Sequence, residues 1–283
     1  KGVYKFAMAV SPLDCMGCTV CVSTCPVKAL TMNPQECQAA EQEVFDYMVA
    51  KVAPKADVED IATVKGSQFK QPLLEFSGSC AGCAETAYAR LITQVCGDRM
   101  YVSNATGCSS IWGGPAATSP YTVNKEGKGP TWANSLFEDN AEHGLGLYLG
   151  QKAIRDRLAD QTRKLIAIDY VDETIAAAAQ KWLDTMEDGA ANGEATKAYI
   201  AAMEGHKAQG EGCTCEACTL VREILKEKEY LNKKSVWIFG GDGWAYDIGY
   251  GGLDHVIASG EDVNIFVFDT EVYSNTGGQA SKA

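Results

Sequence analysis

Residues 14–30, "DCMGCTVCVSTCPVKAL", hold four cysteines at positions 15, 18, 21 and 25, and Pro26 follows the last one. Spacings of two, two and three residues before a Cys-Pro pair are typical of [4Fe–4S] ligation. Structural zinc sites usually take two ligands from each of two separated knuckles, so zinc and a disulfide pair are the weaker alternatives. Where two clusters are present, the fourth cysteine ligates the other cluster. Cys25 therefore needs a second cysteine triplet, and this chain has none of that spacing.

A second group of residues could bind a phosphate and a metal ion. "GGDGWAYDIG" places Gly241, Asp242 and Gly243 after an apolar run, where glycines allow the backbone to approach a phosphate. Thr270, in "FDTEVYSNTGGQ", follows the next apolar run, 28 positions after Asp242 (270 − 242). Carboxylate, hydroxyl and carbonyl oxygens suit Mg²⁺. If both runs are neighbouring strands, their ends predict a site for a diphosphate and a metal ion; tight turns alone are the other interpretation.

A third group consists of Cys80 and Cys83, in "SGSCAGCAE", with Cys108 in "TGCSS". The pair alone could be a redox dithiol. With Cys108 it could ligate a further [4Fe–4S] cluster, which needs a fourth thiolate. Cys37, Cys96 and the 213–218 loop are candidates within the chain.

A fourth group, "GCTCEAC", contains Cys213, Cys215 and Cys218 before an amphipathic helix. It could bind a metal, form a regulatory disulfide or remain a surface loop without a ligand, because three ligands are incomplete. His206 is expected to be a solvated surface residue.

The elements that must position these residues alternate between short apolar runs and helical patterns, which indicates an α/β fold with a mostly parallel sheet. Strands are predicted in "PLLEFSG", "RMYVSN", "KKSVWIFGGDG" and "DVNIFVFDTE". Helices are predicted in "AETAYARLITQVCG", over most of 140–230, and in "YDIGYGGLDHVIASG".

Composition limits the partners and the compartment. The net charge of −12 argues against nucleic acid or an anionic membrane as a partner, and no apolar run has the length of a membrane span. Twelve cysteines without a signal peptide predict a reducing compartment, the cytoplasm or a hydrogenosome-like organelle.

Beyond these patterns, five stretches resemble the C-terminal part of the pyruvate:ferredoxin (flavodoxin) oxidoreductase family: "GGDGWAYDIGYGGLDHV", "VYSNTGGQASKA", "CAGCAETAYARLITQ", "ATGCSSIWGG" and "SLFEDNAEHGLG". "VSPLDCMGCTVCVSTCP" resembles the family's ferredoxin domain. The likeness extends from about residue 10 to the last residue and is weakest over 158–231.

The resemblance implies thiamine diphosphate, Mg²⁺ and [4Fe–4S] clusters as cofactors. It makes Asp242, Thr270 and the carbonyl of Val272 the Mg²⁺ ligands, and Gly241, Gly243, Trp244 and Thr276 the lining of the diphosphate. Asn275 would reach toward the substrate carbonyl and the thiazolium, and Ile111 would bend the cofactor. The clusters would take Cys15, Cys18, Cys21, Cys25, Cys80, Cys83 and Cys108, the last of them also next to the cofactor.

The resemblance also implies an organisation and a reaction. Residues 1–33 would end a ferredoxin-like α+β domain, 34–72 would be a linker with a helix, and 73–283 would be a thiamine-diphosphate-binding domain that is incomplete at its C-terminus. The expected reaction, of pyruvate synthase type, converts pyruvate and coenzyme A to acetyl-CoA and CO₂ and passes electrons to ferredoxin or flavodoxin.

Further expectations concern the rest of the enzyme. A homodimer is expected, with the catalytic glutamate, the other cluster triplet and the fourth ligand of the Cys80 site in parts of the enzyme outside 1–283, so that this segment alone would be inactive. Two other functions stay open: an oxidoreductase of another 2-oxo acid, and a non-catalytic iron–sulfur electron-transfer module.

Overall fold

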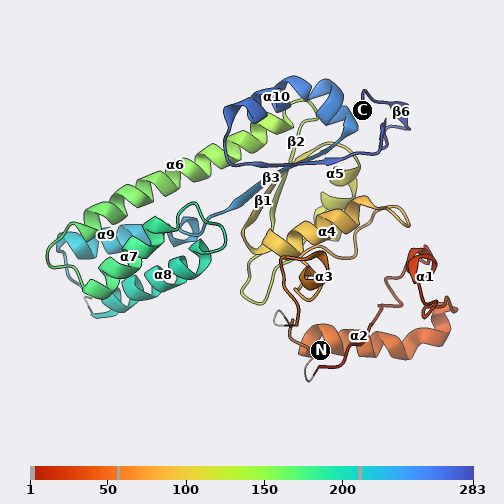
Figure 1. Cartoon of the computed structure of the whole chain (residues 1–283), viewed down its shortest axis with the longest axis horizontal. Helices are drawn as coiled ribbons and strands as arrows, with labels where there is room; N and C mark the ends of the chain where they lie inside the picture. The colour runs from red at the N-terminus through yellow and green to blue at the C-terminus, as the bar shows by residue number, and fades with distance from the viewer. Residues whose placement is uncertain (1–3, 56–57, 210–211) are drawn as a thin grey trace. The chain divides into compact units, whose positions relative to one another are not determined.

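The computed structural model describes residues 4–55, 58–209 and 212–283. The chain forms two compact units, which are described separately (Figure 1). Unit 1 comprises residues 1–98 and 106–130, and unit 2 comprises 99–105 and 131–283. These units do not coincide with the three segments expected from the sequence, so that domain assignment stays a prediction.

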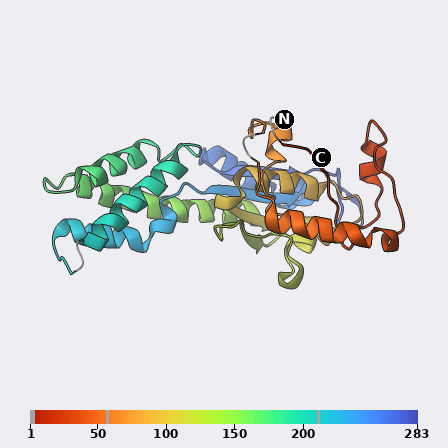
Figure 2. The same ribbon diagram turned by 90° about the horizontal axis from the view of Figure 1, so that it is seen from below.

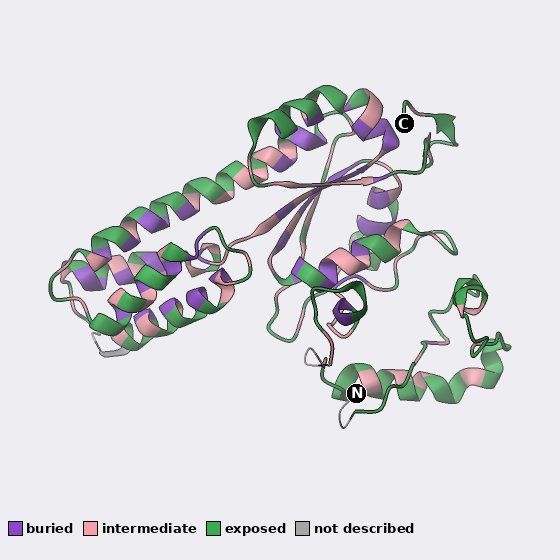
Figure 3. Cartoon of the chain, in the orientation of Figure 1, coloured by how far each residue is buried: buried purple, intermediate pink, exposed green. Residues whose placement is uncertain are grey.

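Unit 1 consists of short helices joined by long loops. The part predicted to be ferredoxin-like contains one short helix and no strand within residues 4–33, so its ferredoxin-like fold stays a prediction. The next helix buries none of its residues, and Figure 3 shows this region as largely exposed. The α-helices of unit 1 are α1 (Val20–Thr24), α2 (Ala39–Lys51), α3 (Val64–Ser67), α4 (Glu85–Cys96) and α5 (Cys108–Gly113).

The strand predicted in "PLLEFSG" is wrong. Leu74 forms only an isolated antiparallel bridge with Tyr121, and Leu73 accepts a hydrogen bond from the Thr122 amide at 3.0 Å. Phe76 has φ of 56°, which breaks the extended conformation directly after the bridge. Leu73 and Leu74 are buried in the core, and this short apolar run resembled a strand in the sequence.

Unit 2 is an α/β unit with a four-stranded parallel sheet in the order β2-β1-β3-β4, which confirms the predicted fold class for this part. Three of its strands match sequence predictions, whereas β2 was not anticipated. The strands are β1 (Met100–Ala105), β2 (Thr131–Ser135), β3 (Ser235–Gly241) and β4 (Asn264–Phe268). A two-stranded antiparallel sheet of β5 (Val272–Tyr273) and β6 (Gln279–Ala280) follows.

A long helix, α6 (Asn140–Ile166), connects two parts of unit 2. Its first turns pack against the sheet so closely that a Cβ on Gly144 would lie 2.4 Å from Ile238 Cγ1. Its later turns pack in one core with three helices that lie beside them in both views (Figures 1 and 2). These are α7 (Glu173–Asp184), α8 (Asn192–Gln209) and α9 (Glu216–Lys226), and they confirm the helical prediction for 140–230.

Two apolar cores stabilise unit 2. One joins the far part of α6 to α7–α9 and includes Leu158, Trp182 and Tyr199, each fully buried. The other lies between the sheet, α6 and α10 (Tyr250–Ser259), and includes Trp244. Among the helices of the described residues, none combines the length and the apolar character needed to cross a bilayer.

Candidate active site

The predicted phosphate and metal residues lie where two parallel strands end side by side. In the β3–β4 ladder Gly241 pairs with Phe268, so the residues after both strands emerge at the same edge of the sheet. The carboxyl edge of a parallel sheet is where ligands of open α/β folds bind. Asp242 and Thr270 stand one and two residues beyond this pair.

Three oxygen-bearing groups meet there. The Thr270 hydroxyl donates to Asp242 Oδ2 at 3.1 Å and lies 3.1 Å from the Val272 carbonyl oxygen. The Ser274 hydroxyl is 2.9 Å from the same Thr270 oxygen. The structure thus brings together the carboxylate, hydroxyl and carbonyl that the sequence predicted as a set.

The Asp242 carboxylate is held in place by the backbone of the next strand end. Its two oxygens accept hydrogen bonds from the Thr270 amide at 2.9 Å and the Glu271 amide at 2.8 Å, and the residue is 1% exposed. Glu271 has φ of 64°, a left-handed conformation that a residue with a side chain rarely adopts. This turn directs two amides at one carboxylate and leaves the Val272 carbonyl beside the Thr270 hydroxyl.

A second carboxylate supports the same turn. Asp269 accepts hydrogen bonds from the Tyr246 hydroxyl at 2.9 Å and the Glu271 amide at 3.1 Å. The Tyr246 hydrogen bond, with a contact to Asp242, holds the pKa of Asp269 below its usual value. Asp269 therefore stays ionised and fixes the position of Tyr246 next to the predicted metal-binding residues.

The turn after β3 is tight because of Gly243. A Cβ on Gly243 would lie 2.6 Å from Phe137 Cζ and 2.9 Å from Tyr273 Cε1. These two rings contact edge to face, and the Tyr273 hydroxyl donates to Asp247 at 2.7 Å. Gly243 thus lets two aromatic rings close over the turn and join it to the loop after β4.

Trp244 was predicted to line the diphosphate, and its side chain is not available for this role. Its side chain is fully buried in the core of the sheet, beneath Gly240 and Gly249. Its indole Nε1 has no hydrogen-bond partner in the described residues. Only its backbone is available to a ligand, in the first turn of the π-helical segment Gly243–Ile248.

The loop that carries Asn275 and Thr276 forms a tight hairpin between β5 and β6. The Thr276 hydroxyl donates to Gln279 Oε1 at 2.7 Å, and the Gly278 amide donates to the Tyr273 carbonyl at 2.9 Å. Both Asn275 and Thr276 are exposed. They are available to a ligand at this end of the sheet, as their predicted roles require.

The donor set fits Mg²⁺ and a diphosphate. Mg²⁺ is usually bound by one or two carboxylates, further oxygen ligands and substrate phosphates. Asp242, Thr270 and Val272 offer only oxygen, and the first turn after Gly243 offers backbone amides for phosphate. These residues could therefore hold the predicted cofactor through its metal.

The Cys15–Cys25 run forms an open loop around short turns. Cys15, Cys18 and Cys21 are exposed, and Gly17 and Thr19 have φ of 67° and 63°. The Ala29 amide donates to Cys25 Sγ at 3.3 Å and lowers the pKa of this thiol. Hydrogen bonds of this kind tune the sulfurs of iron–sulfur clusters.

The second cysteine pair lies directly before α4. Cys80 accepts a hydrogen bond from the Cys83 amide at 3.0 Å, in a turn where Gly82 has φ of 76°. Cys108 begins α5, where Ile111 is exposed. Ligands of a single metal ion lie within about 4.8 Å of one another. Among the described residues, neither these three cysteines nor those of the 15–25 run form such a group. A four-iron cube holds its thiolates farther apart than one ion does.

Cys96 is wrong as a candidate fourth ligand. It ends α4, and a helix of 12 residues is about 18 Å long, so Cys96 lies at the opposite end of this helix from Cys83. Its thiol is 3% exposed and donates to the Ile92 carbonyl at 3.2 Å.

The two cysteine loops of unit 1 adjoin each other. A Cβ on Gly82 would lie 3.4 Å from Val20 Cγ2 and 4.0 Å from Cys18 Cβ. Clusters bound at these loops would be neighbours, although the sequence did not predict this contact.

The sequence did not predict the groups that hold Asp242 and Thr270 in place. Tyr246, Ser274 and the Tyr273–Asp247 pair all lie within the quoted motifs, but no spacing rule assigned them a role. The adjacent Tyr246 and Asp247 in "WAYDIG" were the available signal.

Comparisons with known proteins confirm the resemblance. The chain is 52% identical over 282 residues to a pyruvate-flavodoxin oxidoreductase of Klebsiella pneumoniae, covering 99% of this chain and 23% of that protein. It is 54% identical over 282 residues to a pyruvate:ferredoxin oxidoreductase of Moorella thermoacetica, covering 99% and 24%. It is also 43% identical over 307 residues to a pyruvate dehydrogenase [NADP(+)] of Cryptosporidium parvum, covering 99% and 16%. No protein-family model matches the chain.

The chain spans about a quarter or less of the length of these relatives. Nearly all of it is similar to one segment of pyruvate oxidoreductases.

Proposed function

We propose that this chain is the segment of a pyruvate oxidoreductase that binds the metal–diphosphate end of thiamine diphosphate and carries electrons away through [4Fe–4S] clusters. The reaction is the oxidative decarboxylation of pyruvate, with coenzyme A, to acetyl-CoA and CO₂. The observation that carries the proposal is the convergence of Asp242, Thr270 and the Val272 carbonyl beyond β3 and β4.

Each group in the site has a role in the proposal. Asp242, Thr270 and Val272 ligate Mg²⁺, while Gly241, Gly243 and the Trp244 amide receive the diphosphate at the start of a helical turn. When bound, thiamine diphosphate would supply a positively charged thiazolium ring that accepts the electron pair left by decarboxylation.

The residues around these ligands orient the substrate. Asn275 donates to the substrate carbonyl, and Thr276 lines the diphosphate. Tyr273, held by Asp247, keeps water from the turn at Gly243. For Ile111 and Cys108, the resemblance to the family supports roles next to the cofactor.

Electrons leave through the cysteine loops. Cys80, Cys83 and Cys108 hold one cluster, and Cys15, Cys18 and Cys21 hold another, while Cys25 serves a further one as part of the ferredoxin-like domain. The contact of Gly82 with the Cys18–Val20 segment supports transfer between the first two.

The named relatives favour pyruvate over another 2-oxo acid, because each of those compared carries pyruvate in its name. Ferredoxin or flavodoxin is the proposed acceptor. A pyruvate dehydrogenase named for NADP(+) is similar over as much of this chain, so the comparisons favour pyruvate more strongly than they favour one acceptor. We propose a homodimer in a reducing compartment such as the cytoplasm. The oxygen-rich site disfavours an electron-transfer module without cofactor.

The proposal is tested by the cofactor content of the complete enzyme. After denaturation of the purified protein, thiamine diphosphate and magnesium should be released in about equal amounts, and iron should be present in cluster amounts. Substitution of Thr270 by valine should lower the cofactor content, whereas serine, which keeps the hydroxyl, should restore it. Equal cofactor content in both variants would exclude this metal site.

A further inference from the structure

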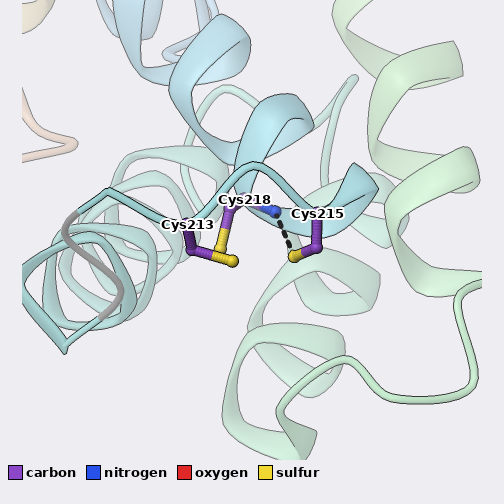
Figure 4. Close-up of side chains that lie close together, drawn as sticks. All are labelled: Cys213, Cys215 and Cys218. Atoms are coloured by element: carbon purple, nitrogen blue, oxygen red, sulfur yellow. Dashed lines mark hydrogen bonds between the residues drawn. The ribbon is translucent and has the colours of Figure 1, made fainter.

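The three cysteines between α8 and α9 form a compact group of sulfur ligands. The Sγ atoms of Cys213, Cys215 and Cys218 all lie within 4.8 Å of one another, and Figure 4 shows them converging where α9 begins. Cys218 is 5% exposed, and the other two are half-buried. This group belongs to unit 2 and includes none of the cysteines in the iron–sulfur runs.

A fourth ligand comes from the preceding helix. His206, near the end of α8, is half-buried, so the expectation that it is a solvated surface residue is wrong. Its Nε2 atom lies 3.4 Å from Cys218 Sγ. The imidazole approaches the group from the side of Cys218, and a bound ion would draw it toward the other two sulfurs.

The sulfur group and the Cys218–His206 contact have roughly the size of a tetrahedral site, whereas His206 lies outside the group of ligand atoms within 4.8 Å of one another and must move toward Cys213 and Cys215 to bind the same ion. With metal–sulfur bonds of about 2.3 Å and metal–nitrogen bonds of about 2.0–2.1 Å, tetrahedral zinc places its ligand atoms roughly 3.5–3.8 Å apart. The contact between Cys218 and His206 is close to this spacing, and the sulfur group needs only a small contraction. Three thiolates and an imidazole match the closed Cys₃His set of structural zinc sites, and no carboxylate belongs to the group that would favour Mg²⁺ or Ca²⁺.

The local backbone holds these ligands in place. Cys215 is the N-cap of α9, and its sulfur accepts a hydrogen bond from the Cys218 amide at 3.5 Å. Arg222 donates to the Cys213 carbonyl at 2.7 Å and so fixes the loop against α9. The partial positive charge of a helix N-terminus favours the thiolate form that a metal ligand needs.

We propose that Cys213, Cys215, Cys218 and His206 form a structural zinc site that joins the end of α8 to the start of α9. Both helices contribute buried residues to one core, Tyr199 and Met203 from α8 and Val221 and Ile224 from α9. A zinc ion at this junction fixes how the two helices enter that core.

Zinc analysis of the complete enzyme tests the site. Purified from cells grown with zinc, the wild-type protein should hold about one zinc ion per chain in addition to its iron. His206→Ala and Cys215→Ser should each remove most of the zinc, while iron content stays unchanged. Cys37→Ser is the matched control, since Cys37 is an exposed thiol outside the group, and it should keep the zinc.

X-ray absorption at the zinc edge tests the ligands without a variant that must fold. The wild-type spectrum should show three sulfur neighbours at about 2.3 Å and one nitrogen neighbour at about 2.0–2.1 Å. Zinc content that is the same in His206→Ala, Cys215→Ser and wild type would overturn the proposal. So would a spectrum dominated by oxygen, or peptide mapping that finds two of the three cysteines joined by a disulfide in anaerobically purified protein.

Discussion

Substitution of Asp242 by asparagine removes the negative charge of this side chain and keeps its size and shape. In the structure the carboxylate accepts hydrogen bonds from the Thr270 and Glu271 amides and from the Thr270 hydroxyl. These three donors hold the carboxylate in one orientation. Asparagine keeps one oxygen as an acceptor, but its NH₂ group faces one of the two backbone N–H groups, which then has no acceptor. Leaving a buried donor unsatisfied costs about 1–3 kcal/mol, which we expect as a lower free energy of unfolding.

The effect on cofactor binding should be larger. Loss of an outer-shell partner of a metal ligand already lowers metal affinity by roughly 10–100-fold, so loss of a charged direct ligand should exceed about 100-fold. This corresponds to about 2.7 kcal/mol or more in the binding free energy of the Mg²⁺–thiamine diphosphate complex.

Isothermal titration of the cofactor-free complete enzyme with thiamine diphosphate, at saturating Mg²⁺, measures this change. Asp254→Asn is the matched control, because it removes the same charge from an exposed position on α10. Thermal unfolding of both variants without cofactor shows whether each is folded. A dissociation constant of folded Asp242→Asn within about threefold of the control would refute the assignment of Asp242 as a metal ligand.

Three further outcomes follow from the structure. Cys18→Ser should lower the iron content by the equivalent of one cluster and slow the reduction of ferredoxin, with thiamine diphosphate still bound; unchanged iron would contradict the ligand assignment. Gly243→Ala should weaken cofactor binding at least tenfold, because its methyl group would displace Phe137 and Tyr273. Gly241→Ala is the control, since a Cβ on Gly241 would meet only the Phe268 carbonyl oxygen, at 3.8 Å. Titration with cofactor should therefore show a larger loss of affinity for the variant at position 243. Leu158→Ala should lower the free energy of unfolding by about 2–5 kcal/mol in denaturant titrations, without a change in cofactor affinity.

The sequence predicted those residues of the site that directly follow a continuous apolar run, Asp242 and Thr270. β3 and β4 are strands of a parallel sheet whose sequences are nearly continuous in apolar residues, and this pattern predicts neighbouring strand ends. Asp242 and Thr270 meet because of that arrangement. The groups that orient them, such as Tyr246 on Asp269, depend on side-chain directions after a turn, which spacing does not determine.

Other features depended on contacts that are distant in sequence. The "PLLEFSG" run resembled a strand because Leu73 and Leu74 are buried, yet the left-handed Phe76 ends the extended segment. β2, "TWANS", has a mixture of polar and apolar residues without a buried position, because it forms the edge of the sheet. His206 and Cys218 are twelve residues apart in the chain, and they meet only because α8 packs on α9.

The central claim is that the site formed by Asp242, Thr270 and Val272 binds the cofactor that delivers electrons from pyruvate to the clusters. The most direct test is anaerobic mixing of the complete enzyme with pyruvate and coenzyme A, followed by electron paramagnetic resonance of the [4Fe–4S] clusters. In wild-type enzyme freed of cofactor, we expect cluster reduction only after Mg²⁺ and thiamine diphosphate are added, and in Asp242→Asn we expect no reduction although the clusters are intact. Reduction of the clusters by pyruvate in Asp242→Asn at the wild-type rate would contradict the central claim.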